Sequence, residues 1–397
     1  MLSGSLKTFL LGNHFNLLST GHHRGGMLWN VELKRSKVVC DRCGSDQTVR
    51  AGRCSSIVRE ESIREMAFWL RIHKHKIYCK LCKKTFTETA PGVLPRRRST
   101  QRFRKCVAQA CGKMSDLSTV SRFHFVSHGF AYQVYYEQLE RKLHEQVQKN
   151  KWPEVVGLDE HFFRRKNGVT EFATMITDLK ARRTFELVHG KDHRSLLDGF
   201  KDIPGRENVK IVVIDMSSTY KSFVKQFFPN AKLVADKFHV MRLFTPHLMR
   251  RGKEIHGHRG ELRTRRKLLW SRQKLDYFLK IEIDQYLKQH KELDAVYRFK
   301  EKLYELYRTK GYMRAVKSFE QLMEQMKSSP LLELQKLSGT FKRWKEEILN
   351  YFLFKYTNGF TERMNGTGKL VQRRAFGYKS FRNYRLRVLS ACLYKNF

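Results

Sequence analysis

The fold is decided by residues 210–218, which read KIVVIDMSS. Four consecutive β-branched residues precede Asp215, and a short continuous apolar run of this kind is typical of a strand buried on both faces. An acid at the end of such a strand lies at the rim of a sheet, where sites form in open α/β folds. The simpler alternative is that Asp215 only caps the next helix. The neighbouring segments must decide between these two roles.

The segments around this strand predict a mixed α/β sheet. We expect three antiparallel strands at residues 155–164, 171–177 and 184–189, followed by a helix at 196–200. A strand at 209–215, a helix at 220–228 and a strand at 232–236 would complete the order. This is the order of a ribonuclease-H-like sheet, in which the first and fourth strands lie side by side. Asp159 and Asp215 would then face each other, and two carboxylates a few Å apart repel unless a cation bridges them.

The charge of the chain points to a nucleic-acid partner. Its 397 residues include 79 Lys and Arg against 38 Asp and Glu, so the formal net charge is +41. Sustained positive charge on a large globular chain is typical of binding to a nucleic-acid backbone, and a ribosomal-type or membrane-surface protein is the alternative. No stretch approaches the roughly 20 apolar residues that span a bilayer, and no signal peptide is recognised, so we expect no membrane partner and a reducing cytoplasm.

Four cysteines form two Cys-x-x-Cys pairs: Cys40, Cys43, Cys79 and Cys82. In a chain without a secretion signal, this pattern favours a metal over disulfides. Four thiolates suit a tetrahedral Zn²⁺, and a site with four protein ligands is structural because it has no open position. The long gap between the pairs leaves room for strands or a helix around residues 66–70. Either His73 or His75 could replace one cysteine, Cys54 is spare, and two unrelated buried pairs are the alternative.

A helical segment follows the cysteine pairs. We expect helices at residues 103–114, about 116–123 and 130–146, with a turn at 127–129. Two short helices around a glycine turn, with a longer helix before them, fit a helix-turn-helix, and a plain helical hairpin is the alternative. In a helix-turn-helix, four side chains would lie near base edges: Ser127, His128, Tyr132 and Gln133.

The last part of the chain contains a further acid on a basic helix. Residues between Pro246 and Pro330 lack proline and predict a helical insertion of about 100 residues. Residues 356–369 follow, with the sequence YTNGFTERMNGTGK. On a helix, one face would carry Glu362, Asn365, Lys369 and Arg373. An acid followed by cations suits a metal ligand beside phosphates, and an ordinary exposed basic helix is the alternative.

Four segments resemble the DDE transposases of the ISL3 insertion-sequence family. They are GLDE at 157–160, VIDMSSTY at 213–220, VADKFHV at 234–240 and TNGFTERMN at 357–365. The cysteine pairs and the helices after them are similar to the zinc-binding domain and the helix-turn-helix of that family. The sequence RRAFGYKSF at 373–381 also fits, so the resemblance extends from about residue 31 to the end.

The resemblance implies a catalytic triad of Asp159, Asp215 and Glu362 that holds two Mg²⁺ or Mn²⁺ ions, in addition to the structural Zn²⁺. Asp236 and His239 match an Asp-x-x-His element and are expected to support the core rather than to bind metal. Lys369 and Arg373 would hold the phosphates of the scissile strand. The chain departs from the family at residue 363, where Arg replaces the usual Gly.

The expected protein is therefore a transposase that cuts DNA and joins strands. Its partners would be the terminal inverted repeats, target DNA and further copies of the chain, on the prokaryotic nucleoid. The alternatives are an inactive DNA-binding regulator and a ribonuclease-H-like, structure-specific nuclease. We expect a poorly defined N-terminal segment at residues 1–30, a zinc-binding domain at 31–95 and a helix-turn-helix at 96–150. The first part of the catalytic core would follow at 151–245, then a helical insertion at 246–350 and the C-terminal part with the third acid at 351–397.

Overall fold

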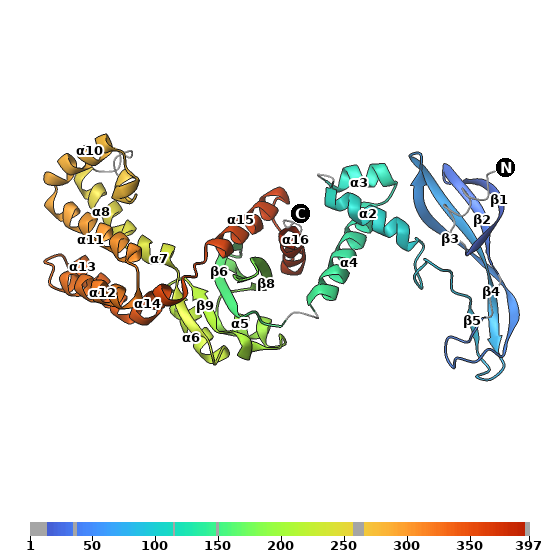
Figure 1. The fold of residues 1–397 in the computed structure, drawn as a ribbon. Coiled ribbons are helices and arrows are strands. Elements are labelled where there is room, and N and C mark those ends of the chain that lie inside the picture. The colour runs from blue at the N-terminus through green and yellow to red at the C-terminus, as the bar shows by residue number, and fades with distance from the viewer. Residues whose placement is uncertain (1–13, 35–37, 114–115, 148–150, 257–265, 394–397) are drawn as a thin grey trace. The chain divides into compact units, whose positions relative to one another are not determined.

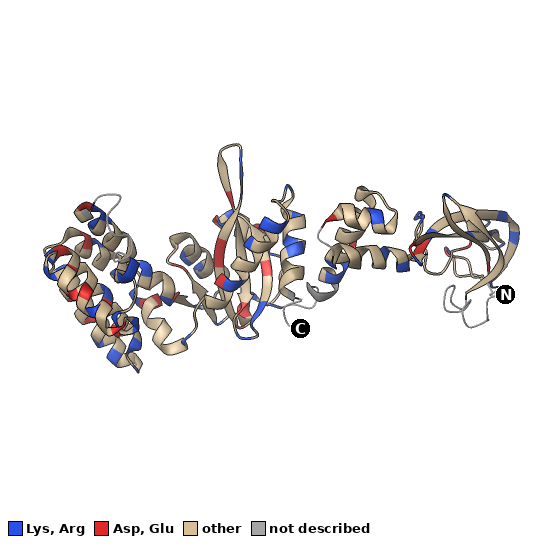
Figure 2. Ribbon diagram, turned by 90° about the horizontal axis from the view of Figure 1, so that it is seen from above, with Lys and Arg blue, Asp and Glu red and all other residues tan. Residues whose placement is uncertain are grey.

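The structure is a computed structural model that describes residues 14–34, 38–113, 116–147, 151–256 and 266–393 (Figure 1). The chain divides into two compact units, Met1–His144 and Glu145–Phe397, and each is described by itself. Lys and Arg residues are spread over both units (Figure 2). Within the described ranges, no helix has the length and apolar character needed to cross a membrane.

The first unit begins with a five-stranded sheet. Its strands are β1 (Phe15–His23), β2 (Gly26–Leu33), β3 (Thr48–Ile63), β4 (Met66–Cys79) and β5 (Thr85–Thr87). Their order is β1-β2-β4-β3, with β5 paired to β4; β2 and β4 are parallel and the other pairs are antiparallel. The stretch around residues 66–70 is therefore part of a strand rather than a helix.

The strands β1 and β2 correct the prediction that residues 1–30 are poorly defined. Residues 1–13 lie outside the described residues, but residues 15–33 form a strand pair that joins the sheet. Trp29 and Val31 of β2 are buried against Phe68 and Ile72 of β4, so the pair contributes to the core. The signal in the sequence is weak because β1 buries none of its residues fully and mixes polar with apolar side chains.

Three helices complete the first unit, where they were expected: α2 (Gln101–Lys113), α3 (Leu117–His124) and α4 (His128–Val147). Met114, the predicted end of the first helix, and residues 148–150 lie outside the described residues. Asp116 caps α3 by accepting a hydrogen bond from the backbone of Thr119, and Phe125 ends that helix in the left-handed conformation. A short middle helix between two others is thus confirmed, whereas its role in reading DNA stays a prediction.

The second unit contains a mixed sheet with the predicted strand order. Its strands are β6 (Val155–Lys166), β7 (Val169–Asp178), β8 (Arg183–His189), β9 (Ile211–Ile214) and β10 (Lys232–Ala235), in the order β10-β9-β6-β7-β8. Strands β6, β9 and β10 are parallel, and β7 and β8 are antiparallel to their neighbours. The first and fourth strands of the unit, β6 and β9, are therefore neighbours.

Residues 211–214 form β9, and this strand is buried on both faces, as its apolar sequence predicted. Val212 and Ile214 belong to a large core that includes residues of α5 (His193–Phe200) and α6 (Ser218–Phe227). Ile211 and Val213 belong to a separate core on the other face. Because successive side chains of a strand point to opposite faces, a continuous aliphatic run satisfies both cores. Strand β9 is thus fixed from both sides, and so is the turn that follows it.

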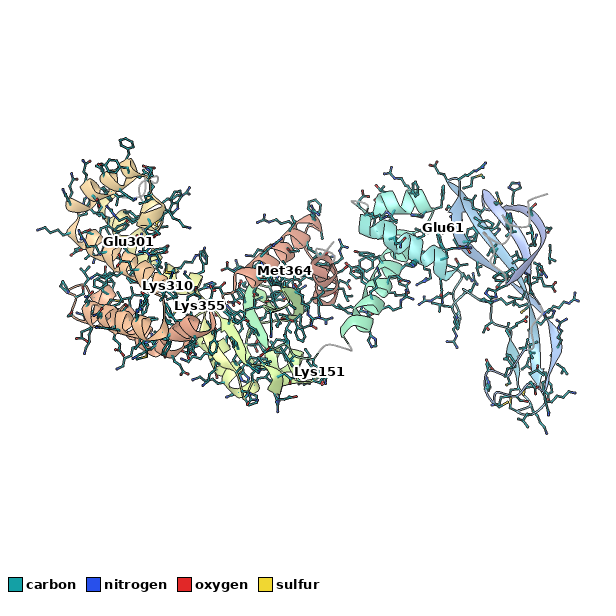
Figure 3. All side chains as sticks on the ribbon, viewed as in Figure 1. Glu61, Lys151, Glu301, Lys310, Lys355 and Met364 are labelled. Carbon is teal, nitrogen blue, oxygen red and sulfur yellow. The ribbon has the colours of Figure 1, made fainter. Side chains whose placement is uncertain are left out.

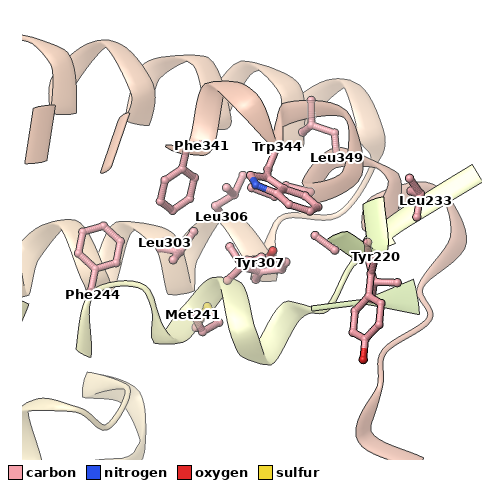
Figure 4. Close-up of a cluster of buried hydrophobic side chains, with 14 of the residues drawn as sticks. Tyr220, Leu233, Met241, Phe244, Leu303, Leu306, Tyr307, Phe341, Trp344 and Leu349 are labelled. Carbon is pink, nitrogen blue, oxygen red and sulfur yellow. The ribbon is translucent and has the colours of Figure 1, made fainter. Parts of the chain in front are cut away.

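The helical insertion is helical as expected and shares the large core of the sheet. After α7 (Lys237–Arg242) its helices are α8 (Thr245–His256), α10 (Tyr277–Lys288), α11 (Lys291–Arg308), α12 (Tyr312–Lys327), α13 (Leu332–Arg343) and α14 (Lys345–Phe354). Leu303, Leu306 and Tyr307 of α11 lie close to Trp344 and to Met241 of α7 in this cluster (Figure 4). The ends of α11 and α14 are therefore held against the β10–α7 turn.

Two helices return to the sheet after α14. Helix α15 (Gly359–Arg374) contacts β6 and β7, and α16 (Phe381–Leu393) contacts β8 and α15. The approach of α15 to β6 is close at Gly157, where a Cβ would lie 2.3 Å from Thr361 Oγ1 and 2.7 Å from Asn358 Oδ1. Glycine at this position therefore allows the start of α15 to rest directly on the strand that carries Asp159.

Candidate active site

Asp159 and Asp215 lie at the same edge of the sheet. The parallel ladder between β6 and β9 ends at the pair Gly157 and Val213, and each acid comes two residues later. Both carboxylates are half-buried. Burial is the largest cause that raises the pKa of each to about 6; Glu160 acts in the same direction on both, and His239 opposes it. The negative charge of Asp215 also raises the pKa of Asp159.

The capping role considered for Asp215 is wrong. The N-cap residue of α6 is Ser217, whose hydroxyl accepts the hydrogen bond from the backbone of Tyr220 at 3.4 Å. Asp215 accepts one backbone hydrogen bond, from Ser217 at 3.1 Å. One oxygen of Asp215 thus fixes the turn between β9 and α6, and the carboxylate does not serve as the N-cap of α6.

Glu362 reaches the site from the first turn of α15. One of its carboxylate oxygens lies in a group with a carboxylate oxygen of Asp236 and a ring nitrogen of His239, and these potential ligand atoms are all within 4.8 Å of one another. Within the described residues, this close group does not extend to Asp159 or Asp215. His239 connects the two sets: its hydrogen bond with Asp236 is the main cause that raises its pKa, and the charges of Asp159 and Asp215 add to the effect.

Asp236 belongs to this group and also connects several segments through hydrogen bonds. It caps α7 by accepting from the backbones of Phe238 and His239, and it accepts from the backbone of Asn358 at 2.8 Å. The side chain of Asn358 in turn donates to the carbonyl of Leu158 at 2.7 Å. These bonds tie α7, α15 and β6 together and agree with the predicted support role. The spacing of Asp236, His239 and Glu362 would also suit a metal ion, so the support role stays a prediction.

Three linked hydrogen bonds connect Asp159 to Tyr384 through Asn365 and His161. Asn365 donates from Nδ2 to Asp159 Oδ2 at 2.9 Å, and its Oδ1 lies 2.8 Å from Nδ1 of His161. The other ring nitrogen of His161 lies 2.6 Å from the hydroxyl of Tyr384 on α16. Burial lowers the pKa of His161 to about 4, so the ring is neutral. Since an amide oxygen only accepts, Nδ1 carries the proton and Nε2 accepts from Tyr384.

Sequence reasoning placed Asn365 on the face of Glu362 but gave no role to His161 or Tyr384. A signal for His161 exists, because it is two residues after Asp159 and so points to the same face of β6. Tyr384 carried no local signal. Lys369 and Arg373 are exposed on α15 beyond Glu362, as expected for residues that would contact phosphates.

Comparison with known proteins identifies the family of the chain. The sequence profile of the ISL3-type DDE family, described as a transposase, matches residues 156–388, which is over half of the chain. The chain belongs to the ISL3 family of DDE transposases. It is also 23% identical over 391 residues to the transposase for insertion sequence element IS1001 of Bordetella parapertussis, with 92% of each chain covered. The resemblance seen in the sequence is therefore confirmed, and the family implies a DNA-cutting enzyme that uses a divalent metal.

The four predicted zinc ligands of the transposase come together in the first unit. Sγ of Cys40 lies 3.7 Å from that of Cys82, and Sγ of Cys43 lies 3.6 Å from that of Cys79. Zn–S bonds of about 2.3 Å in a tetrahedron place sulfurs about 3.8 Å apart, so the spacing fits zinc. Backbone hydrogen bonds lower the pKa of Cys40 to about 7, whereas burial raises the pKa of Cys82 to about 11, so it is the sulfur spacing that supports zinc. His75 instead lies 3.4 Å from Glu88, and neither His73 nor Cys54 joins the group.

The four residues proposed to read bases are exposed around the start of α4 in the transposase. Ser127 accepts from the backbone of Phe130 at 3.2 Å and so helps to begin the helix. Gln133 donates to Glu137 at 2.8 Å, and the ring of Tyr132 lies against that of Tyr136. His128 is the first residue of α4. Their exposure suits contact with DNA, and the assignment stays a prediction.

Proposed function

We propose that this transposase cuts DNA at the ends of an insertion sequence and joins those ends to target DNA, with Asp159, Asp215 and Glu362 as the catalytic acids of a ribonuclease-H-like core. The observation that supports it most is the meeting of two acids at one sheet edge, from the neighbouring strands β6 and β9. The second support is that His239 belongs to one close group with Glu362 of α15, while the charges of Asp159 and Asp215 also act on its ring.

The site fits divalent cations by its donor set. Mg²⁺ and Mn²⁺ prefer carboxylate oxygens, and Asp159, Asp215 and Glu362 supply them. The raised pKa values of Asp159 and Asp215 show that the charged forms lack sufficient compensation, which bound cations would provide. Two such ions would activate the attacking oxygen and stabilise the leaving oxygen of an in-line displacement at phosphorus.

Other residues of the chain would orient Asp159, hold the DNA strand and recognise the DNA ends. Asn365 fixes the orientation of Asp159 through its 2.9 Å hydrogen bond. Lys369 and Arg373 are placed to hold phosphates of the scissile strand, and the zinc-binding and helical modules of the first unit recognise the DNA ends. A strand nick by water and attack of the new 3′-hydroxyl on target phosphate need no covalent intermediate with the protein.

Incubation with DNA tests this function against its two alternatives. The purified protein is mixed with Mg²⁺, target plasmid and linear DNA that carries the sequences flanking its own gene. We expect a nick that leaves a 3′-hydroxyl, followed by joined products in the plasmid. Binding to these ends without any cleavage would favour an inactive regulator. Cleavage of branched junctions without a requirement for the end sequence would favour a structure-specific nuclease.

The hydrogen-bond chain behind Asp159 predicts a metal-dependent defect in the variant Tyr384→Phe. The change leaves Nε2 of the buried His161 without its donor, so Asn365 holds Asp159 less firmly. Changes to groups that orient a metal ligand typically cost about 10–100-fold in metal affinity or activity. We expect cleavage to fall about tenfold at limiting Mg²⁺ and to recover in part at high Mg²⁺, measured as the Mg²⁺ concentration that gives half-maximal cleavage.

Tyr277→Phe is the matched control because Tyr277 is 70% exposed on α10. It should change neither the rate nor the metal requirement. A loss of cleavage in Tyr384→Phe with an unchanged Mg²⁺ requirement would mean that Tyr384 acts only through the stability of α16, and the proposed orienting role would be wrong.

A further inference from the structure

Four cations from separate segments gather beside the candidate active site. Lys237 directly follows Asp236 and begins α7, Lys274 ends η2 (Arg272–Lys274), Arg308 ends α11 and Lys355 follows α14. We call them the α7 cation patch. Figure 3 labels Lys355 at the junction between the helical insertion and α15, the helix that carries Glu362. The positive charges of Lys355, Arg308 and Lys274 all act on Lys237.

Aromatic rings fix the two lysines of the patch in place. Nζ of Lys237 lies 5.6 Å from the ring centroid of Tyr351, and Nζ of Lys355 lies 5.2 Å from the same ring. Lys237 is also 5.3 Å from the ring of Tyr307, which is buried and stacks on Phe352. Cations over aromatic faces are held by the ring quadrupole. The two ammonium groups are therefore positioned by the core of the insertion rather than extended freely into solvent.

Among the described residues, the patch has no acidic partners. Within the described ranges, no member forms an ion pair with a carboxylate, whereas other cations of the same segment do: Arg251 pairs with Glu333, and Arg272 with Asp284. Burial and then the three neighbouring charges lower the pKa of Lys237. Like charges brought together without acids destabilise the fold, and an anion bound among them would remove that cost.

Helix capping explains only part of this arrangement. Cations at helix C-termini are favourable because of the helix dipole, which accounts for Arg308 and Lys355. Lys237 occupies the opposite, N-terminal end of α7, where a cation is unfavourable. Burial, and after it the negative charge of Asp236, raises the pKa values of Tyr307 and Tyr351, the rings under the lysines. The patch therefore adjoins the acids of the candidate active site directly.

We propose that Lys237, Lys274, Arg308 and Lys355 bind consecutive backbone phosphates of the DNA strand that runs from the active site along the helical insertion. This inference rests on the proposed function, since it takes DNA as the substrate of the neighbouring acids. It assigns the insertion a DNA-holding role of its own, in addition to that proposed for Lys369 and Arg373 on α15. The polyanionic DNA backbone supplies the missing compensation for four unpaired cations.

The double variant Lys237→Gln, Lys355→Gln tests the proposal through binding alone. The full-length protein is titrated with a fluorescently labelled duplex of the flanking sequence, without divalent metal, over a series of KCl concentrations. We expect the affinity to fall by about tenfold or more at low salt, and the slope of log K against log salt to fall by roughly 0.9 for each phosphate that the variant no longer neutralises. Because no cleavage is measured, this result is independent of whether the wild-type protein cuts DNA.

Two further double variants separate the effect of these two positions from a general loss of charge and from misfolding. The pair Lys336→Gln, Lys342→Gln removes the same charge from exposed positions on α13 and should keep most of the affinity. The pair Lys237→Arg, Lys355→Arg keeps the charge and should restore binding, which separates charge from folding. An unchanged salt slope in the Gln pair, or an equal loss of affinity in the α13 pair, would overturn the proposal. The expected binding changes together with no cleavage by the wild-type protein would instead count against the proposed function.

Discussion

The variant Asp215→Asn should lose strand cleavage and strand transfer and still bind the DNA ends. Asparagine has the shape of aspartate but carries no charge, so the turn from β9 to α6 keeps its hydrogen bond with Ser217 while a metal ligand is removed. Metal ions supply several kcal/mol of transition-state stabilisation, and about 1.4 kcal/mol corresponds to a factor of ten. We expect a loss of at least about a thousandfold, measured by gel assays of nicked and joined products.

Asp198→Asn is the control for this variant. Asp198 is exposed on α5, where it faces Lys201 at 3.5 Å, and its charge is the same as that of Asp215. It should cleave and bind like the wild-type protein, and thermal unfolding should show both variants to be folded. Strand transfer at the wild-type rate by Asp215→Asn would show that the acids at this sheet edge do not carry the chemistry.

The order of the second sheet was predictable from sequence because its strands leave strong local signals. An aliphatic run such as residues 211–214 has no polar face to expose, and the structure buries it between two cores. The parallel register of β6 and β9 then places Asp159 and Asp215 at one edge without further information. Strand β1 was missed because its partly exposed residues give neither a continuous apolar run nor a clear alternation.

In the candidate site, sequence reasoning reached only the three proposed acids. Asp159, Asp215 and Glu362 could be named from strand order and from resemblance to a family. The hydrogen bond between His161 and Tyr384 joins residues 223 positions apart, so it depends on how α16 packs against the sheet. The same is true of the contact between Lys237 and Tyr351, which arises from the packing of α14 on α7, whereas Lys355 follows Tyr351 by only four residues. No local pattern encodes contacts of this kind.

The variant Cys79→Ser should remove zinc from the first unit and destabilise it. Cys79 is fully buried, and its Sγ lies 3.6 Å from that of Cys43 within the group of four thiols. Structural zinc contributes about 10–16 kcal/mol of apparent binding free energy in small domains, and loss of a metal belongs to the few changes that exceed about 4 kcal/mol. We expect zinc content to fall from one ion per chain to well below one, with faster hydrogen exchange around β3–β5.

Cys54→Ser separates this effect from the loss of any cysteine. Cys54 is half-buried on β3 and lies outside the group of four thiols, so its variant should keep zinc and stay within about 1 kcal/mol of the wild-type stability. Because the proposed catalytic acids belong to the other compact unit, Cys79→Ser should unfold at its N-terminal end while residues of the second sheet keep their protection from exchange. If Cys79→Ser retains one zinc per chain and normal exchange at residues 48–79, the four thiols do not form the zinc site and the crowded cysteines need another explanation.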